Sequence, residues 1–230
     1  MSFRLEPSRD RKLYRMLRDA EVRSLRRGQA LYEPGTPARD VFLVREGYLR
    51  LVLPGMEQGS RLRTAGLALP WEFVGFEALT RGLRRYGAVA GCSSAVQALP
   101  GGAVMRALKS ARRTLDAYLE GTERELHRVR HARAGSHGPT TRQRLAEVVL
   151  DLAERAGEKV GREIRLDVRP THQVLADLAG AHRATVTTLL NDWLYEGILR
   201  DREGVMIVVR PAALWALAGY AEAEPSGDVR

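Results

Sequence analysis

The residues best placed to do chemistry lie around Arg183, in segment 171–198, which reads THQVLADLAGAHRATVTTLLNDWLYEGI. The small residues of AGAH stand immediately before Arg183, and polar residues follow it. On either side, apolar residues recur at the three- and four-residue intervals of an α-helix, at Leu175, Leu178, Val186, Leu189, Leu190, Trp193 and Leu194. The segment is therefore either a buried helical hairpin or a pair of helices that presents Arg183 to a partner.

The elements around this pair have a definite order. Thr140 or Thr141 can cap a helix that ends near Ala156, and Thr171 can cap the first helix of the pair. GEKVGREIRLDVRP, between them, predicts a loop and a short strand. ILRDREGVMIVVRP, after the pair, predicts two strands joined by a turn in which Gly204 supplies a positive φ. Helix, strand, helix, turn, helix and hairpin is the order of a winged helix-turn-helix.

The first hundred residues have a different texture, in which short apolar runs alternate with Pro-Gly, Glu-Gly and Gln-Gly-Ser turn signals. Residues 41–43, 48–53, 88–89 and 95–99 have the β-rich composition of strands. The spacing predicts an antiparallel β-barrel or roll over residues 25–103.

After the PGG sequence at residues 100–102, the pattern of the sequence predicts a long helix over 104–134. One interpretation is that this helix packs on the barrel of its own chain. The other is a dimerisation helix, because the apolar rhythm alternates four- and three-residue steps as in a coiled coil. The expected contact residues are Leu115, Leu119, Thr122, Leu126 and Val129. The expected domains are a basic N-terminal segment 1–24, the roll 25–103, the helix 104–134, a hinge 135–139, the winged helix-turn-helix 140–212 and a tail 213–230.

Composition limits the classes of protein. The 230 residues suffice for two modest domains, and 44% hydrophobic with 28% charged residues is typical of a globular chain. The net charge of +9 favours polyanionic partners, although residues 140–212 carry eleven basic and eleven acidic side chains. One cysteine, Cys92, cannot form an intrachain disulfide or a four-cysteine metal site. No apolar run approaches a membrane span and no secretion signal is evident, so we expect a cytoplasmic protein.

A β-roll, a long helix, a hinge and a winged helix-turn-helix, in that order, resemble the cyclic-AMP receptor protein/Fnr (CRP/FNR) family of bacterial transcription regulators. THQVLADLAGAHRATVTTLLNDWLYEGIL is similar to the family pattern T-x-x-x-L-A-x-x-x-G-x-x-R-x-T-V-x-x-x-L-x-x-L-x-x-x-G-I/L. GYLRLVL looks like a barrel strand of the family and PWEFVGFEAL like its barrel loop. The resemblance covers residues 25–212 and implies an α+β fold with a cyclic-nucleotide-binding-like β-roll.

The resemblance also implies how the chain reads DNA. Arg183 matches the family arginine that reads a guanine, whose O6 and N7 accept two hydrogen bonds from a guanidinium. Two further reading positions hold Ala184 and Thr188, so the operator should differ from the family's best-known half-site. Thr171, Gln173 and Thr185 match phosphate-contacting positions. The complete expected set is Thr171, His172, Gln173, His182, Arg183, Ala184, Thr185, Thr187 and Thr188.

The sensor pocket is the weakest match. Cyclic-nucleotide-binding members carry Gly-Glu-Leu and, about ten residues later, Arg-Ser/Thr-Ala, where this chain has GFEAL at 75–79 and RRYGAV at 84–89. A displacement of one residue along a strand turns a side chain to the other face. We therefore expect no cyclic-AMP binding in the usual manner and a vestigial pocket in which Phe76 and Tyr86 partly fill the ligand space. Its residues would be Gly75, Phe76, Glu77, Arg85 and Tyr86.

The expected function is thus a homodimeric activator that binds a palindromic operator in double-stranded DNA without cyclic AMP, with RNA polymerase as a partner implied by the resemblance. One alternative is a regulator gated by another small molecule. The other is a signal-binding module whose helix-turn-helix contacts protein, which the neutral charge of residues 140–212 keeps open. We expect that the protein is not an enzyme and that it holds no cofactor or metal ion. The sequence shows no glycine-rich phosphate loop, no nucleophile elbow and no spacing typical of metal ligands.

Overall fold

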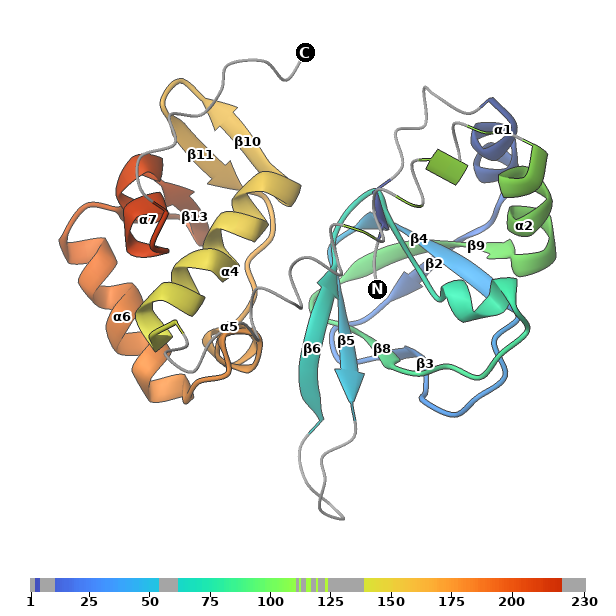
Figure 1. Ribbon diagram of the computed structural model, residues 1–230, viewed down its shortest axis with the longest axis horizontal. Coiled ribbons are helices and arrows are strands. Elements are labelled where there is room, and N and C mark those ends of the chain that lie inside the picture. The colour runs from blue at the N-terminus through green and yellow to red at the C-terminus, as the bar shows by residue number, and fades with distance from the viewer. Residues whose placement is uncertain are drawn as a thin grey trace. The chain divides into compact units, whose positions relative to one another are not determined.

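The computed structural model describes residues 3–4, 11–53, 62–110, 112, 115–116, 119, 123 and 139–220. The chain divides into two compact units, Met1–His131 and Ala132–Arg230, here called the N-terminal and C-terminal units (Figure 1). Among the described residues, no helix combines the length and the hydropathy needed to cross a membrane.

Two antiparallel sheets form the N-terminal unit. Their strand orders are β1-β7-β4-β9-β2 and β3-β8-β5-β6. The elements are β1 (Phe3–Arg4), α1 (Arg11–Asp19), β2 (Val22–Leu25), β3 (Ala30–Tyr32), β4 (Asp40–Glu46), β5 (Leu49–Leu53), β6 (Arg63–Ala68), β7 (Glu72–Val74), the 3₁₀-helix η2 (Phe76–Leu79), β8 (Gly87–Ala90), β9 (Ser94–Pro100) and α2 (Gly101–Ser110).

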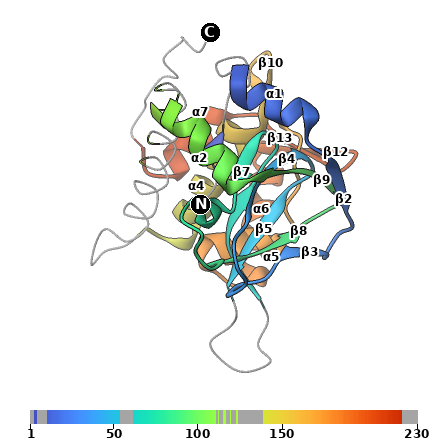
Figure 2. The same cartoon turned by 90° about the vertical axis from the view of Figure 1, so that its right-hand side faces the viewer.

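Strand β4 shows how the sequence builds this unit, because its four central residues are all buried but alternate between two clusters. Phe42 and Val44 join an interior cluster drawn from both sheets. Val41 and Leu43 point to the opposite face and join an outer cluster with residues of α1, η2 and α2. Figure 2 shows α1 and α2 side by side on this outer face. The continuous apolar run is therefore explained by a sheet covered on both faces.

The predicted strands of the roll correspond to β4, β5, β8 and β9, with β5 beginning one residue later than expected, at Leu49. The expected boundary at residue 25 is wrong, since β2 begins at Val22 and pairs with β9. Leu17 of α1 is buried in the outer cluster. The end of the N-terminal segment is thus part of the roll, because Val22 lies in a strand paired with β9.

The predicted dimerisation helix is described only in part. Beyond α2, residues 112, 115, 116, 119 and 123 are helical. Leu115 and Leu119 lie one helical turn apart and are 40% and 54% exposed. The other expected contact residues, Thr122, Leu126 and Val129, lie outside the described residues, as do residues 135–138 of the predicted hinge.

The described part of the C-terminal unit, residues 139–220, combines four helices with one antiparallel sheet in the order β10-β11-β13-β12. Its elements are α4 (Thr141–Ala156), β10 (Gly157–Val160), β11 (Glu163–Leu166), α5 (His172–Ala179), α6 (Arg183–Tyr195), β12 (Leu199–Arg202), β13 (Val205–Val208) and α7 (Pro211–Leu217).

The caps of this unit follow the sequence. Thr140 caps α4 in a capping box, in which its hydroxyl accepts from the Gln143 amide while the Gln143 side chain accepts from the Thr140 amide. Thr171 caps α5 by accepting from the Val174 amide. Gly204 has a φ of 85° in the turn between β12 and β13, as the hairpin requires.

Two expectations for this unit are wrong. Residues 157–160, expected to be a loop, form β10 and pair with β11. Residues 213–217, expected to belong to a tail, lie in α7, which packs against α4 and buries Leu214 completely. The C-terminal unit therefore continues past residue 212.

Candidate nucleic-acid interface and barrel pocket

The turn between α5 and α6 places Arg183 at the start of a helix. Gly180 ends α5 in the left-handed conformation with a φ of 58°, which glycine adopts without strain. His182 then takes an extended conformation as the N-cap, and Arg183 is the first residue of α6 (Figure 1). Amides in the first turn of a helix have no helical acceptor and attract anions. A guanidinium and a helix N-terminus thus meet at one exposed place.

The two faces of α6 differ sharply. Its inner face carries buried Val186, Leu190 and Trp193, whose exposed fractions are 3% or less. On the opposite face, helical geometry aligns four exposed residues, Ala184, Thr188, Asn191 and Tyr195. Apart from Tyr195, these side chains are short. The inner face anchors the helix, and the opposite face is free to meet a groove.

Several of the expected DNA-contacting residues also make bonds within the unit. His172 Nδ1 and Thr187 Oγ1 are 2.9 Å apart, so these half-buried side chains join α5 to α6. The half-buried Gln173 donates to Asp177 Oδ1 at 3.1 Å, and exposed Thr188 donates to the Ala184 carbonyl at 3.2 Å. The exposed members of the expected set are Thr171, His182, Arg183, Ala184, Thr185 and Thr188.

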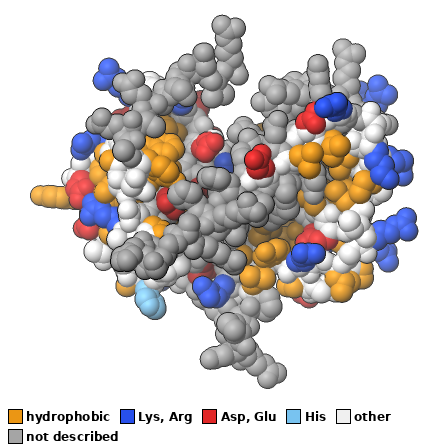
Figure 3. All heavy atoms as spheres, in the orientation of Figure 1, with side chains coloured by type: hydrophobic (Ala, Val, Ile, Leu, Met, Phe, Trp, Pro, Cys, Tyr) orange, Lys and Arg blue, Asp and Glu red, His pale blue; other side chains and the backbone are white. Residues whose placement is uncertain are grey.

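Several arginines of the C-terminal unit are paired with carboxylates. Arg142, Arg155, Arg169 and Arg200 form ion pairs with Glu196, Asp151, Asp201 and Glu163, respectively. Within the described part of this unit, the Arg183 guanidinium has no such partner. Figure 3 accordingly shows acidic and basic side chains interspersed on the visible face of the unit, without one large basic area.

The wing is the β12–β13 hairpin, and its turn is fixed by Asp201. Asp201 Oδ1 accepts from the Gly204 amide at 3.0 Å, and its carboxylate also pairs with Arg169. β13 lies between β11 and β12 in the sheet. The hairpin is therefore held along one strand and at its turn.

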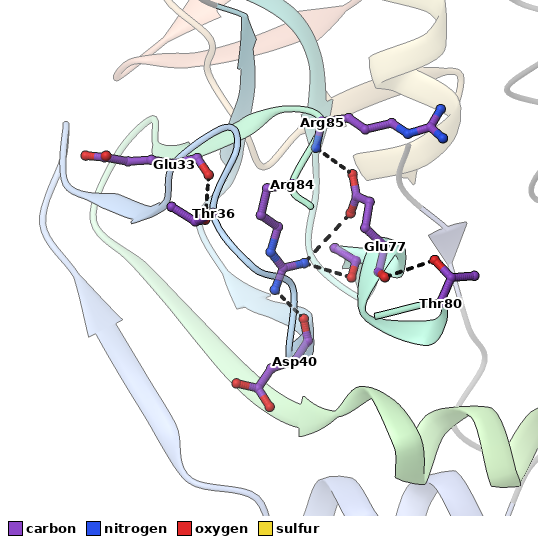
Figure 4. A network of polar contacts seen from close by, with 8 residues as sticks. Glu33, Thr36, Asp40, Glu77, Thr80, Arg84 and Arg85 are labelled. Carbon is purple, nitrogen blue, oxygen red and sulfur yellow. Dashed lines mark hydrogen bonds and ion pairs between the residues drawn. The ribbon is translucent and has the colours of Figure 1, made fainter. Parts of the chain in front are cut away.

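The barrel pocket is organised by Arg84, which is 4% exposed. Its Nη1 donates to the Gly75 carbonyl at 2.8 Å and its Nη2 donates to the Asp40 carbonyl at 2.6 Å (Figure 4). Glu77 Oε2 lies 3.8 Å from Nη1. The guanidinium carbon lies 4.2 Å from the ring centroid of Tyr32. Burial raises the pKa of the Tyr32 phenol, and the positive charge of Arg84 opposes that rise.

This arrangement corrects the expectation that Arg85 and Phe76 line the pocket. Arg85 is exposed, and its main-chain amide donates to Glu77 Oε1 at 3.2 Å. Phe76 packs on the outer cluster, with its ring centroid 6.4 Å from that of Phe73, so it does not fill the barrel interior. Tyr86 does pack against the interior cluster. The buried arginine is Arg84, which sequence reasoning missed because two adjacent arginines offer no signal to separate them.

The Arg84 network requires a glycine at position 75. Its φ is 84°, and a Cβ added there would lie 2.2 Å from Arg84 Nη1. The carbonyl of Gly75 also accepts the hydrogen bond from that nitrogen. Among the described residues, no cluster of three or more His, Cys, Asp or Glu side chains is arranged to hold a metal ion.

A winged helix-turn-helix beside a cyclic-nucleotide-binding-like roll defines the class of protein as a DNA-binding transcription regulator. The model of the Crp-like helix-turn-helix domain matches residues 143–217. Transcriptional regulator SdrP of Thermus thermophilus is 31% identical over 188 residues, which cover 80% of this chain and 87% of SdrP. The chain belongs to the CRP/FNR family of transcriptional regulators.

Other comparisons agree. The global nitrogen regulator of Synechococcus elongatus is 27% identical over 203 residues, which cover 84% of this chain and 88% of that protein. The crystal structure of TTHB099, a CRP-family transcriptional regulator of Thermus thermophilus, superposes with a TM-score of 0.63 at 27% identity over 86% of this chain and 96% of that one. FixK2 of Bradyrhizobium japonicum shares the fold, with a TM-score of 0.71 at 22% identity over 89% and 99% of the two chains. The expected family and fold class are thus confirmed.

Proposed function

We propose that the protein is a homodimeric, sequence-specific transcription regulator that binds a roughly palindromic operator in the cytoplasm without needing cyclic AMP. The observation that carries the DNA-reading part is Arg183, exposed and without an ionic partner among the described residues, at the N-terminus of a helix whose other face is anchored by Trp193. In the major groove this guanidinium donates two hydrogen bonds to one guanine, and the first-turn amides of α6 face phosphate.

Dimerisation is supported by the helix that follows the roll. Leu115 and Leu119 are large apolar side chains at one-turn spacing, and both are exposed in the single chain. A second copy would cover them, because apolar residues at such positions form the seam between paired helices. Two-fold symmetry then presents two α6 helices to half-sites about 34 Å apart, which makes the operator palindromic.

Independence from cyclic AMP is supported by the Arg84 network. The guanidinium already donates to two main-chain carbonyls, faces Glu77 and stacks on Tyr32. An anion could reach it only by displacing these partners. We also propose activation through contact with RNA polymerase, a role supported by the resemblance to the family, and the exposed hairpin end at residues 158–162 is a candidate surface for that contact.

Selection of binding sites from random duplex DNA by purified protein, with and without cyclic AMP, tests the proposal. We expect one palindrome to be recovered equally well in both conditions. Recovery only with cyclic AMP would refute independence from the nucleotide, and tight binding in a calorimetric titration would do the same. Recovery of no duplex in either condition would refute constitutive DNA binding and leave the regulator gated by another small molecule or the helix-turn-helix that contacts protein.

The matched variants are Arg183→Ala and Arg165→Ala. Arg165 is also exposed, but it lies on β11 and its Nε is 3.6 Å from Asp167. The first change should weaken binding by about 1–3 kcal/mol and relax the preference at one base pair per half-site, whereas the second should alter neither. Equal effects of the two would remove Arg183 from the reading set.

A helix-turn-helix that contacts protein is the alternative that the neutral C-terminal unit leaves open. Salt separates the two, because each neutralised phosphate adds about −0.9 to the slope of log affinity against log salt. A contact with protein through apolar surface would depend little on salt.

A further inference from the structure

Arg144, in the first turn of α4, holds together three separate pieces of the C-terminal unit. Its Nε donates to the Ala179 carbonyl at 2.7 Å, and its Nη2 donates to the Gly180 carbonyl at 3.3 Å. Its Nη1 donates to the Pro139 carbonyl at 2.6 Å, and Nη2 also donates to Thr141 Oγ1 at 3.2 Å. One half-buried side chain thus joins the end of α5 to the start of the unit.

Arginine is the residue suited to this place. The last carbonyls of a helix have no helical donor, and the helix dipole makes that end negative. Ala179 is the last residue of α5 and Gly180 is its C-cap, so a cation there satisfies both requirements. The planar guanidinium carries five N–H groups in a fixed fork, whereas a lysine ammonium is a point charge that cannot span the same acceptors.

The positions of the acceptors show which parts of the unit Arg144 connects. Ala179 and Gly180 form the turn that leads into Arg183, the residue placed at the start of α6. Pro139 is the last residue of the predicted hinge and the first described residue of the C-terminal unit. Arg144 therefore ties Pro139 to the turn that leads into α6.

The neighbouring Arg142 holds the other end of α6. Its Nη2 lies 3.2 and 3.3 Å from the two carboxylate oxygens of Glu196, the C-cap of α6. Both partners are about 40% exposed, so this pair contributes little on its own. Together, however, Arg142 and Arg144 connect one turn of α4 to the C-terminal end of the reading helix and to the turn that precedes it.

We propose that Arg144 is a positioning residue that fixes Pro139, the first described residue of the C-terminal unit, relative to the turn before α6, and thereby the spacing at which a dimer reads its two half-sites. The inference rests on the proposed function. A rigid connection is needed for the second half-site to be met in register, since a loose one lowers the effective concentration of the second reading helix and costs ordering on binding. Reading of a single half-site needs α6 but not this connection.

The experiment uses the full chain and the palindrome selected by the wild-type protein. Dissociation constants are measured for that palindrome, for versions with one base pair inserted or removed between the half-sites, and for a duplex with a single half-site. The variant is Arg144→Lys, which keeps the charge. The control is Arg155→Lys in the last turn of the same helix, where the arginine pairs with Asp151 of its own helix at 2.6 Å.

For Arg144→Lys we expect about tenfold weaker binding to the native palindrome, equivalent to about 1.4 kcal/mol. Affinity for the single half-site should change less than twofold, and discrimination against the altered spacings should fall. Arg155→Lys should match the wild type throughout. A purely structural role would lower the melting temperature without moving the spacing preference.

Three results would overturn the proposal for Arg144. They are unchanged binding to every duplex, equal weakening on the half-site and the palindrome with the spacing preference intact, and a chain that no longer folds. A wild-type protein that selects no duplex would refute the proposed function itself, which makes the two failures distinguishable.

Discussion

Replacing Arg84 by methionine should destabilise the N-terminal unit by about 3–5 kcal/mol. Methionine keeps an unbranched apolar stem but removes the guanidinium, which donates to the carbonyls of Gly75 and Asp40. A hydrogen bond from a charged donor contributes about 1.5–3 kcal/mol, so two of them contribute about 3–6 kcal/mol. Glu77 would lose its cation in the same change, but its side chain is 21% exposed and 3.8 Å from Nη1, so this loss costs less than that of a fully buried pair.

Hydrogen exchange of the β4 and β5 amides measures this change in the full chain, because their opening reports the N-terminal unit separately from the C-terminal unit. Arg85→Met is the matched control. The Arg85 side chain is exposed, and the hydrogen bond from Arg85 to Glu77 uses the main-chain amide, so its replacement should cost less than about 0.5 kcal/mol. A loss below about 1 kcal/mol for Arg84→Met, similar to that of the control, would refute the view that Arg84 is fixed by the protein's own groups.

Three further changes test other parts of the structure. Gly75→Ala should lower the stability of the N-terminal unit by about 1–3 kcal/mol in the same exchange measurement, because its φ is 84° and its Cβ would meet Arg84; a neutral change would show that the network can shift. Leu214→Ala should lower the free energy of unfolding of the C-terminal unit by about 2–5 kcal/mol in urea, since Leu214 is 0% exposed; an unchanged value would return residue 214 to the tail. Thr140→Ala should cost about 1 kcal/mol through loss of the capping box, whereas Thr140→Ser, which keeps the acceptor, should cost much less in the same titration.

The parts of the fold that the sequence could predict are those whose burial repeats with a period. Helices α4, α5 and α6 each combine a buried face with a recognisable start, at Thr140, Thr171 and the AGAH turn. The unpredicted elements have no such period. Three of the four residues of β10 are exposed, and α7 has only seven residues with Leu214 as its one buried side chain.

The residues that line the predicted pocket also lie outside regular, periodic elements. The argument that neighbouring side chains point to opposite faces applies to a strand, but Phe76 and Glu77 lie in a 3₁₀-helix. Arg84 precedes β8 and lies in an irregular connection, where no period tells which of two adjacent arginines turns inward. Only the positions of its acceptors, far away in the sequence at Asp40 and Gly75, decide it.

The short side chains on the outer face of α6 limit how many base pairs the protein can recognise by direct contact. Ala184 offers only a methyl group, and the Thr188 hydroxyl already donates to a carbonyl of its own helix. In the proposed mode of binding, where Arg183 meets a guanine, further discrimination among operators would come largely from how readily each sequence bends or narrows its groove to fit the two α6 helices of a dimer. A search for target promoters should score the flexibility of the base steps between the half-sites as well as the letters within them.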